Sequence, residues 1–296
     1  MQTVSEKLRK KRALILNSFH NPLLICRENP LFSYFSSDNR AECVLVKNSI
    51  MENIGNKEVN DKFGVADEST CILQPFFNYR PQKACEFSED ELFQFPLNEE
   101  VRIIKECRKE IEAQVVSELS NATTESTERQ VVNAMKKRIC SIGIDTFYEP
   151  IVSFDENTRE IWHKPGNSKI GKLSYVEIAC NINGISSLYS ETFLFSDIDY
   201  LSLQYKNILN AIELIKKNFV EGESTSYVST ILDNFRNEKL YLTNPLFPFK
   251  CHLMPGEEEV VHTGDIAVFD LWNRAGNTYI RKKVMALAGS YRAEIL

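Results

Sequence analysis

The feature that most constrains the fold of this chain is an internal repeat within residues 97–296. The segment from Tyr175 to Ala179 aligns with the segment from Ile266 to Asp270, about 91 residues later. Solenoid repeats are shorter than this, so the offset indicates a duplicated α/β half. Each half predicts two helices followed by an antiparallel ribbon. Two curved ribbons backed by four helices would form an α+β layer fold.

Local patterns support this division into elements. Apolar residues recur at helical spacing from Asn98 onward and predict a first helix. Thr127 and Gln130 have the spacing of a capping box, which predicts a second helix that runs towards Cys140 and ends at Gly143. Two amphipathic helices are expected again in the second half, over 201–219 and 225–235. The expected strands cover 147–154, 173–182, 188–195, 241–249, 265–272 and 277–287.

The first 96 residues have a different character. Two short apolar runs, 23–26 and 43–46, are bounded by polar turn residues and predict buried strands. A turn-rich stretch and several prolines follow them, up to Pro96. We therefore place a domain boundary near Pro96, with one domain at 1–96 and a second at 97–296.

Composition excludes several classes of protein. Hydrophobic residues make up 43% of the chain, which is too many for a disordered protein, and no apolar run approaches the ~20 residues of a membrane span. The net charge of −6 argues against nucleic-acid binding through bulk charge. Eight cysteines without a Cys-x-x-Cys pair are typical of free thiols in a reducing compartment, so we expect a cytoplasmic protein.

From about Asn98 to its end, the chain resembles the creatinase, Xaa-Pro aminopeptidase and prolidase group. The resemblance implies a duplicated "pita-bread" domain, and the first 96 residues resemble a shortened form of that group's α/β N-terminal domain. The motifs that carry it, in order, are Thr127-Glu128, Pro150-Ile151-Val152-Ser153, His163-Lys164-Pro165-Gly166, Gly184, Glu191-Thr192-Phe193 and Met254-Pro255-Gly256 before Gly264.

The resemblance also implies a metal site, because most active members bind two divalent ions through two aspartates, a histidine and two glutamates. Most of these ligands are replaced here. In the order of the two aspartates, the histidine and the two glutamates, the matching positions are Ala179, Leu188 (Ser190 without a gap), the neighbourhood of Tyr241, Asp270 and Arg281.

Charge decides what such a pocket can hold. Arginine does not lose its proton, and Ala179 and Leu188 offer no lone pairs to a metal. At ~4 Å and an effective dielectric constant near 20, Arg281 would repel one divalent ion by about 8 kcal/mol. We therefore predict no metal pair and no other cofactor. Asp270 and Arg281 are expected to face each other on one ribbon as an ion pair that fills the former site.

Other residues are candidates for the cleft. The substrate-contacting histidine of the resembled group falls on Trp162, and His163 is adjacent to it. His163 is either a solvent-exposed loop residue or a ligand contact. Four aromatic residues would also line the cleft of this fold: Trp162, Tyr241, Phe249 and Trp272.

Three functions follow from these assignments. The first is an inactive relative of the peptidases, a pseudopeptidase that binds a peptide or protein partner and forms a homodimer by analogy. The second is a metal-free, creatinase-type hydrolase of a guanidino or amide substrate, which needs His163 in the cleft beside Glu177, Glu191 or Asp270. The third is an active Xaa-Pro peptidase with altered metal ligands.

Overall fold

The computed structural model describes residues 8–10, 13, 23–26, 35–36, 43–47, 50–54, 71–73, 97–160, 162–182, 185–196, 198–233 and 260–296. The expected strand at 241–249 and the motif at 254–256 lie outside these residues. The chain divides into two compact units, Met1–Gln94 with Asn181–Ser186, and Phe95–Cys180 with Ser187–Leu296. None of the helices described for this chain combines the length and the apolar character needed to cross a membrane.

The first unit contains a four-stranded sheet with the order β3-β2-β1-β4. Its strands are β1 (Leu23–Cys26), β2 (Cys43–Lys47), β3 (Ile50–Ile54) and β4 (Cys71–Leu73). β2 pairs antiparallel with both β1 and β3, and β4 pairs parallel with β1. Val44 and Val46 are buried on alternate positions of β2, as a strand with one apolar face requires. Both strands predicted in the first 96 residues are confirmed.

The first half of the second unit follows the predicted order of helices and strands. Its elements are α4 (Asn98–Asn121), α5 (Glu128–Ser141), β5 (Asp145–Thr146), β6 (Ile151–Phe154), the 3-10 helix η2 (Asp155–Arg159), β7 (Leu173–Ile182) and β8 (Ile185–Leu194). β7 lies between β5 and β6 in its sheet and also pairs with β8, which completes the first ribbon. The strand predicted over 147–154 is shorter than expected, since it begins only after Pro150, which has no N–H to donate.

Two local signals act as predicted at α5. The Thr127 Oγ1 atom accepts from the Gln130 N–H at 3.3 Å, and the Gln130 Oε1 atom accepts from the Thr127 N–H at 2.9 Å. This capping box satisfies two N–H groups that the first turn of a helix leaves open. After the helix ends, Gly143 adopts a φ of 74°, a conformation that glycine reaches without steric cost.

The second half repeats this pattern of helices and ribbon. Its elements are α6 (Asp199–Asn218), α7 (Thr225–Asp233), β9 (Ile266–Ala275), β10 (Thr278–Leu287) and β11 (Glu294–Ile295). β9 and β10 form an antiparallel ribbon, and β11 pairs with the other edge of β10. The two predicted helices and the two predicted ribbon strands are confirmed, and so is the duplicated α+β arrangement.

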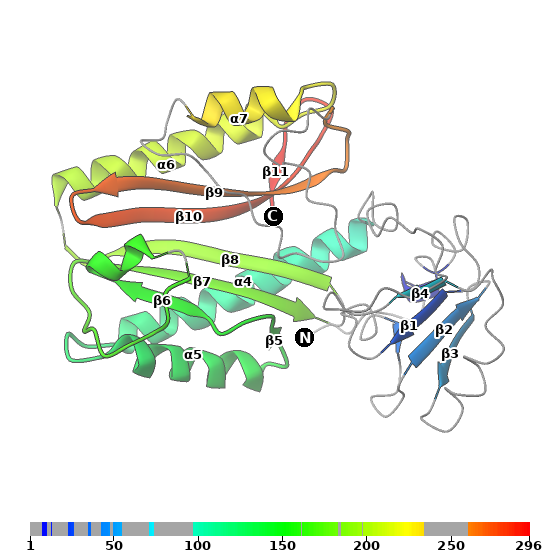
Figure 1. Cartoon of the computed structure of the whole chain (residues 1–296), viewed down its shortest axis with the longest axis horizontal. Coiled ribbons are helices and arrows are strands. Elements are labelled where there is room, and N and C mark those ends of the chain that lie inside the picture. The colour runs from blue at the N-terminus through cyan, green and yellow to red at the C-terminus, as the bar shows by residue number, and fades with distance from the viewer. Residues whose placement is uncertain are drawn as a thin grey trace. The chain divides into compact units, whose positions relative to one another are not determined.

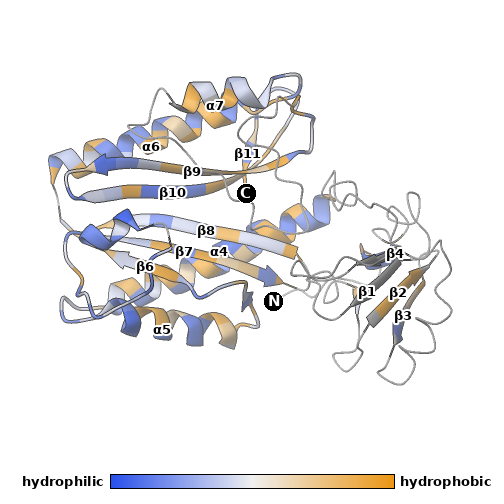
Figure 2. Ribbon diagram, viewed as in Figure 1, coloured by the Kyte–Doolittle hydropathy of each residue, from blue (hydrophilic) through white to orange (hydrophobic). Residues whose placement is uncertain are grey.

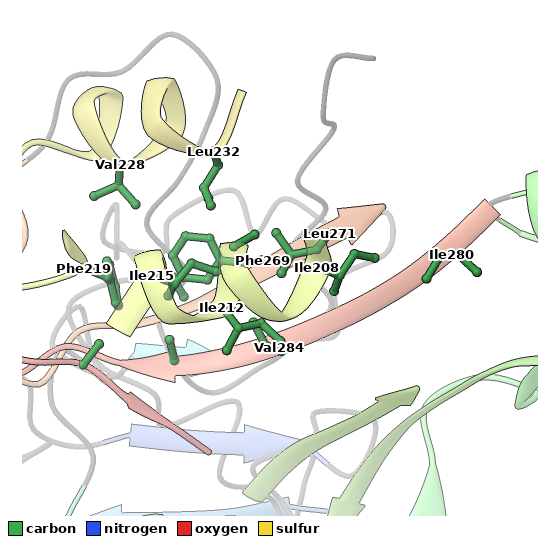
Figure 3. Packing of buried hydrophobic residues seen from close by; sticks show 14 of the residues in the cluster. Ile208, Ile212, Ile215, Phe219, Val228, Leu232, Phe269, Leu271, Ile280 and Val284 are labelled. Carbon is green, nitrogen blue, oxygen red and sulfur yellow. The ribbon is translucent and has the colours of Figure 1, made fainter. Parts of the chain in front are cut away.

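The two ribbons of the second unit lie next to each other between two pairs of helices (Figure 1). α6 and α7 cover the β9–β10 ribbon, where Ile212, Ile215 and Phe219 of the α6 region pack with Phe269 of β9 (Figure 3). The rings of Phe219 and Phe269 meet edge to face at 5.3 Å. Burial of such side chains contributes roughly 1.5–3 kcal/mol each. The middle of β10 is hydrophilic although it is covered on both faces (Figure 2).

The loop between η2 and β7 is fixed by one aspartate and one glycine. The Asp155 Oδ1 atom accepts from the backbone N–H groups of Lys172 and Leu173, at 2.8 and 3.1 Å. A Cβ atom on residue 171 would lie 1.7 Å from Asp155 Oδ2, so only Gly171 allows this close approach. The loop that carries Trp162 and His163 is therefore closed by defined hydrogen bonds.

Candidate functional site

The candidate site lies where the inner faces of the two ribbons meet. Because side chains alternate along a strand, Tyr175, Glu177 and Ala179 share one face of β7. On β8, the Ser190 Oγ atom accepts from the Lys283 N–H at 2.9 Å. The Thr192 Oγ1 atom accepts from the Arg281 N–H at 3.0 Å and donates to the Arg281 carbonyl at 2.6 Å. Two side-chain hydroxyl groups thus join β8 to the backbone of β10.

Four buried charged residues meet between the ribbons, and we call them the charged cluster: Glu177, Asp270, Arg281 and Lys283. Their relative exposures are between 0% and 7%. The Lys283 Nζ atom lies 2.8 Å from Glu177 Oε1 and 3.9 Å from Asp270 Oδ2, and Arg281 Nη2 lies 3.4 Å from Asp270 Oδ2. Two carboxylates and two cations balance, so the charged cluster is formally neutral.

The predicted contact between Asp270 and Arg281 is confirmed, but the predicted register is wrong. Asp270 lies directly opposite Lys283 on the ribbon, and Arg281 lies opposite Trp272. Arg281 therefore reaches Asp270 along a diagonal. Lys283 was missed in the sequence, although its two-residue spacing from Arg281 placed both cations on one face of the strand.

Glu177 is the well-satisfied carboxylate of the charged cluster. It accepts hydrogen bonds from the Tyr148 and Tyr175 hydroxyls, both at 2.5 Å, and from Lys283. Burial alone would raise its pKa, but the charge of Lys283 and the three hydrogen bonds outweigh burial and lower the pKa of Glu177. Burial and the charge of Glu177 raise the pKa values of Tyr148 and Tyr175, so both hydroxyls remain protonated donors.

Asp270 is the poorly satisfied carboxylate. Its Oδ1 atom is buried and has no hydrogen-bond partner among the described residues. Burial raises the pKa of Asp270, and the nearby charges of Arg281 and Lys283 offset this only in part. The Arg281 guanidinium also lies 4.7 Å from the centroid of the Tyr175 ring, a cation–π distance.

These residues do not fit a pair of divalent ions. Ala179 and Leu188 lie buried, with exposures of 1% and 3%, and have only hydrocarbon side chains. Within the described parts of the chain, no three His, Cys, Asp or Glu side chains come together as metal ligands. The two carboxylates that remain, Glu177 and Asp270, are already paired with Lys283 and Arg281. A two-metal site needs carboxylates free to neutralise four positive charges.

Trp162 lies beside the charged cluster. Its ring packs edge to face on Tyr148, with centroids 5.7 Å apart, and the Lys283 Nζ atom lies 5.6 Å from its ring centroid. The residue is nevertheless 55% exposed. Trp162 therefore presents an indole to solvent at the edge of the buried cluster.

His163 is held in a different place. Its Nε2 atom lies 2.8 Å from Glu128 Oε2 and its Nδ1 atom 3.1 Å from Glu160 Oε2, and its side chain is 9% exposed. Burial opposes the charged form, but the hydrogen bonds and charges of Glu128 and Glu160 outweigh it and raise the pKa of His163. Two acceptors on one ring favour the doubly protonated imidazolium. The solvent-exposed interpretation of His163 is therefore wrong.

Glu128, which the sequence analysis did not assign to the site, anchors this loop. Its side chain is fully buried at the N-terminus of α5, where the helix dipole favours a negative charge. It also accepts from the backbone N–H groups of Phe154 and Gly166, at 2.8 and 2.9 Å. Two signals pointed to it in the sequence: its position directly after the helix cap Thr127, and its place in the Thr127-Glu128 motif of the resemblance.

The creatinase-type arrangement is not formed. In the part of the chain that the structure describes, His163 hydrogen-bonds to Glu128 and Glu160 and not to Glu177, Glu191 or Asp270. Glu191 instead pairs with Lys282 and accepts from the Tyr205 hydroxyl at 2.8 Å. The catalytic histidine that this mechanism requires therefore has no carboxylate partner at the charged cluster.

The remaining cleft candidates are separated. Trp272 is half-buried, and its ring packs at a tilt against Tyr279, with centroids 5.3 Å apart. It also borders a small hollow between α6, α7 and β9. Tyr241 and Phe249 lie outside the described residues, so their predicted place in the cleft stays a prediction.

Comparison with known proteins defines the fold but not a sequence family. No protein-family profile and no curated protein matches the sequence. The prolidase of Pyrococcus horikoshii superposes with a TM-score of 0.70 at 12% identity, over 97% of each chain. X-Pro aminopeptidase from Thermotoga maritima gives 0.69 at 12%, again over 97% of each chain. A histidine variant of Escherichia coli aminopeptidase P gives 0.71 at 12% identity, over 99% of this chain and 95% of that one.

These structures resemble the chain along nearly its whole length, including the first 96 residues. The resemblance inferred from the sequence motifs is therefore confirmed in three dimensions. At 12% identity the comparison establishes the architecture of the chain, and its chemistry has to be argued from the residues of the site. The chain therefore has the pita-bread fold of these prolidase and aminopeptidase structures.

Proposed function

We propose that this protein is a pseudopeptidase: a peptidase-fold protein that holds no catalytic metal pair and binds a peptide or protein instead of cleaving it. The charged cluster is the observation that carries this proposal. Lys283 and Arg281 place two cationic side chains between the ribbons, in the region where the resemblance implies a pair of metal ions. They neutralise Glu177 and Asp270, so the site has no negative charge left for a metal.

The energetics favour the side-chain cations over metal ions. One divalent ion ~4 Å from a single positive charge is repelled by about 8 kcal/mol at an effective dielectric constant near 20. Lys283 and Arg281 would each repel the ion in this way. Removing their partners would leave unpaired buried charges, which costs about 3–5 kcal/mol. The ion pairs therefore stabilise the charged cluster without a metal, and the two side-chain cations repel a divalent ion that enters it.

Metal analysis together with a peptidase assay tests the proposal. The full chain is incubated with Mn²⁺ or Co²⁺, separated from free ions and analysed for bound metal. Hydrolysis of Ala-Pro and Gly-Pro peptides is measured in parallel, with an active prolidase as the positive control. We expect neither stoichiometric metal nor release of the N-terminal residue. Two bound ions per chain, or turnover that depends on added Mn²⁺, would support the third function, an active Xaa-Pro peptidase.

The exposed indole of Trp162 supports the binding role. It projects to solvent beside Tyr148 and close to the charge of Lys283, so a bound peptide would stack on an aromatic face at the edge of the charged cluster. Titration of short peptides against the fluorescence of a Trp272→Phe variant, whose remaining indole is Trp162, measures this. We expect a saturable change in this fluorescence. Calorimetric titration, which needs no indole, should then show that Trp162→Ala abolishes binding, whereas Tyr291→Ala, at a residue 94% exposed, leaves it unchanged. Binding that survives loss of Trp162 would place the partner elsewhere.

Location and assembly complete the proposal. We place the protein in the cytoplasm because Cys107, Cys140 and Cys180 are free thiols, which suit a reducing compartment. A homodimer is proposed by analogy with the resembled group, and sedimentation of the purified chain measures it. A mass equal to one chain across the concentration range would remove the dimer.

A further inference from the structure

Two buried cysteines of the second unit point at each other. Cys107 on α4 and Cys180 on β7 have their Sγ atoms 3.3 Å apart. Their relative exposures are 2% and 0%. A disulfide has an S–S bond of about 2.05 Å, so the two sulfur atoms would have to approach by roughly 1.3 Å. The two thiols are therefore in direct contact, within a short movement of the bonding distance.

The surroundings hold both thiols in this arrangement. The Cys180 Sγ atom also donates to the Ser187 carbonyl at 3.4 Å, and the Ser187 hydroxyl donates to the Ile104 carbonyl of α4 at 3.2 Å. The hydrogen bond to Cys107, together with burial, raises the pKa of Cys180 well above its usual range. Cys180 is thus a neutral thiol in the native state, whereas the thiolate is the reactive form.

We propose that Cys107 and Cys180 are an oxidation site that forms an intramolecular disulfide with a small disulfide oxidant such as oxidised glutathione. The thiolate of one cysteine attacks a sulfur of the oxidant and expels one glutathione thiolate, which leaves a mixed disulfide. The second cysteine, as its thiolate, attacks the protein sulfur of that disulfide and expels the second glutathione. Two protein thiols are oxidised to one disulfide, and one oxidised glutathione is reduced to two thiols, whose protons are the two that the cysteines give up.

Burial sets the rate of this reaction. The oxidant reaches the sulfur atoms only when α4 opens locally from β7, so formation of the bond is slow under native conditions. Once formed, the bond closes a loop between positions 73 residues apart and restricts the unfolded chain. We expect the thermal midpoint of the second unit to rise by about 10 °C. This inference does not depend on the proposed function.

Peptide mapping of the full chain tests it. The protein is incubated in a buffer of oxidised and reduced glutathione, alkylated, digested without reductant and analysed by mass spectrometry. We expect a linked peptide pair that contains Cys107 and Cys180, with a mass lower by two hydrogens and formation that speeds up in mild urea. Cys140 is exposed and serves as the internal comparison, since it should take up glutathione first without raising the midpoint.

Variants separate the cross-link from other oxidation. Cys107→Ala and Cys180→Ala should each lose the rise in the thermal midpoint, and Cys140→Ser should keep it. Mapping of the unmodified sequence remains decisive even where an alanine variant folds poorly. No 107–180 peptide under mild urea, or a rise in the midpoint that Cys107→Ala retains, would overturn the proposal.

Discussion

The two ribbons of the second unit have the same architecture and opposite inner chemistry. The inner face of β7 and β8 presents one carboxylate, Glu177, among hydroxyl and hydrocarbon groups. The inner face of β9 and β10 presents both cations of the charged cluster and the carboxylate of Asp270, so the two faces carry opposite net charge. Their outer faces pack on helices in the same way. The comparison teaches that the duplicated frame depends on the outer faces, so the residues of the inner faces can differ between the halves without loss of the fold.

Removal of Lys283 should have the largest effect on this balance. Lys283→Met leaves Glu177 without its cation and Asp270 with one fewer, so we expect a loss of about 3–5 kcal/mol in the free energy of unfolding. Urea denaturation measures it. Lys169→Met is the matched control, because Lys169 pairs with Glu125 at the surface and should cost less than about 1 kcal/mol. Equal losses in both variants would contradict the structural role of the cluster.

The two carboxylates should respond unequally. Glu177→Gln disturbs three hydrogen bonds to a charged acceptor and should cost about 3 kcal/mol. Asp270→Asn, at a group with an unpartnered oxygen and a raised pKa, should cost about 1 kcal/mol. Both values come from denaturation at neutral pH. If Asp270→Asn lowers the free energy of unfolding more than Glu177→Gln does, then Asp270, and not Glu177, is the better satisfied carboxylate.

Helix caps compare the two halves at a smaller scale. Thr127 caps α5 with a reciprocal bond from Gln130. At the start of α7, the Ser224 Oγ atom accepts from the Tyr227 N–H at 3.1 Å and shares a hydrogen bond of 3.0 Å with the Ser226 hydroxyl, without a reciprocal glutamine or glutamate. Thr127→Ala should therefore cost about 1 kcal/mol, and Ser224→Ala less. Thermal unfolding of the two variants gives the comparison. A larger loss at Ser224 would show that the capping box adds nothing.

The smallest expected effect is a dependence on pH from His163. Because its pKa is raised in the folded chain, its contribution to stability is complete below about pH 6.5, the ordinary histidine value, and is lost as the pH rises through the raised value. His163→Gln should remove this dependence, so the difference between the two proteins should shrink towards alkaline pH. Unfolding midpoints of the two proteins, measured from about pH 6 upward, give this difference. A difference that grows with pH would contradict the ion pair between His163 and Glu128.

How far the sequence predicts this molecule differs between fold and site. Periodicity and capping signals predict the helices and ribbons because these depend on local patterns. The pairing of Asp270 was misplaced by two residues, since the turn between Ala275 and Thr278 sets the register and places Lys283 opposite Asp270. A shift of two keeps the same face, which is why the contact with Arg281 was still found. The partners of His163 depend on a loop closed by Asp155 and Gly171, which no spacing rule reveals.

The hydroxyl bridges from Ser190 and Thr192 have a consequence for access to the site. They tie β8 to β10 by three hydrogen bonds on the same seam that the ion pairs of the charged cluster cross. Parting the halves would break all of these together, so a visiting molecule must approach at the rim, where the indole of Trp162 is already in water. The interior between the ribbons therefore acts as a structural joint, and the solvent-exposed part of this region is the rim that carries Trp162.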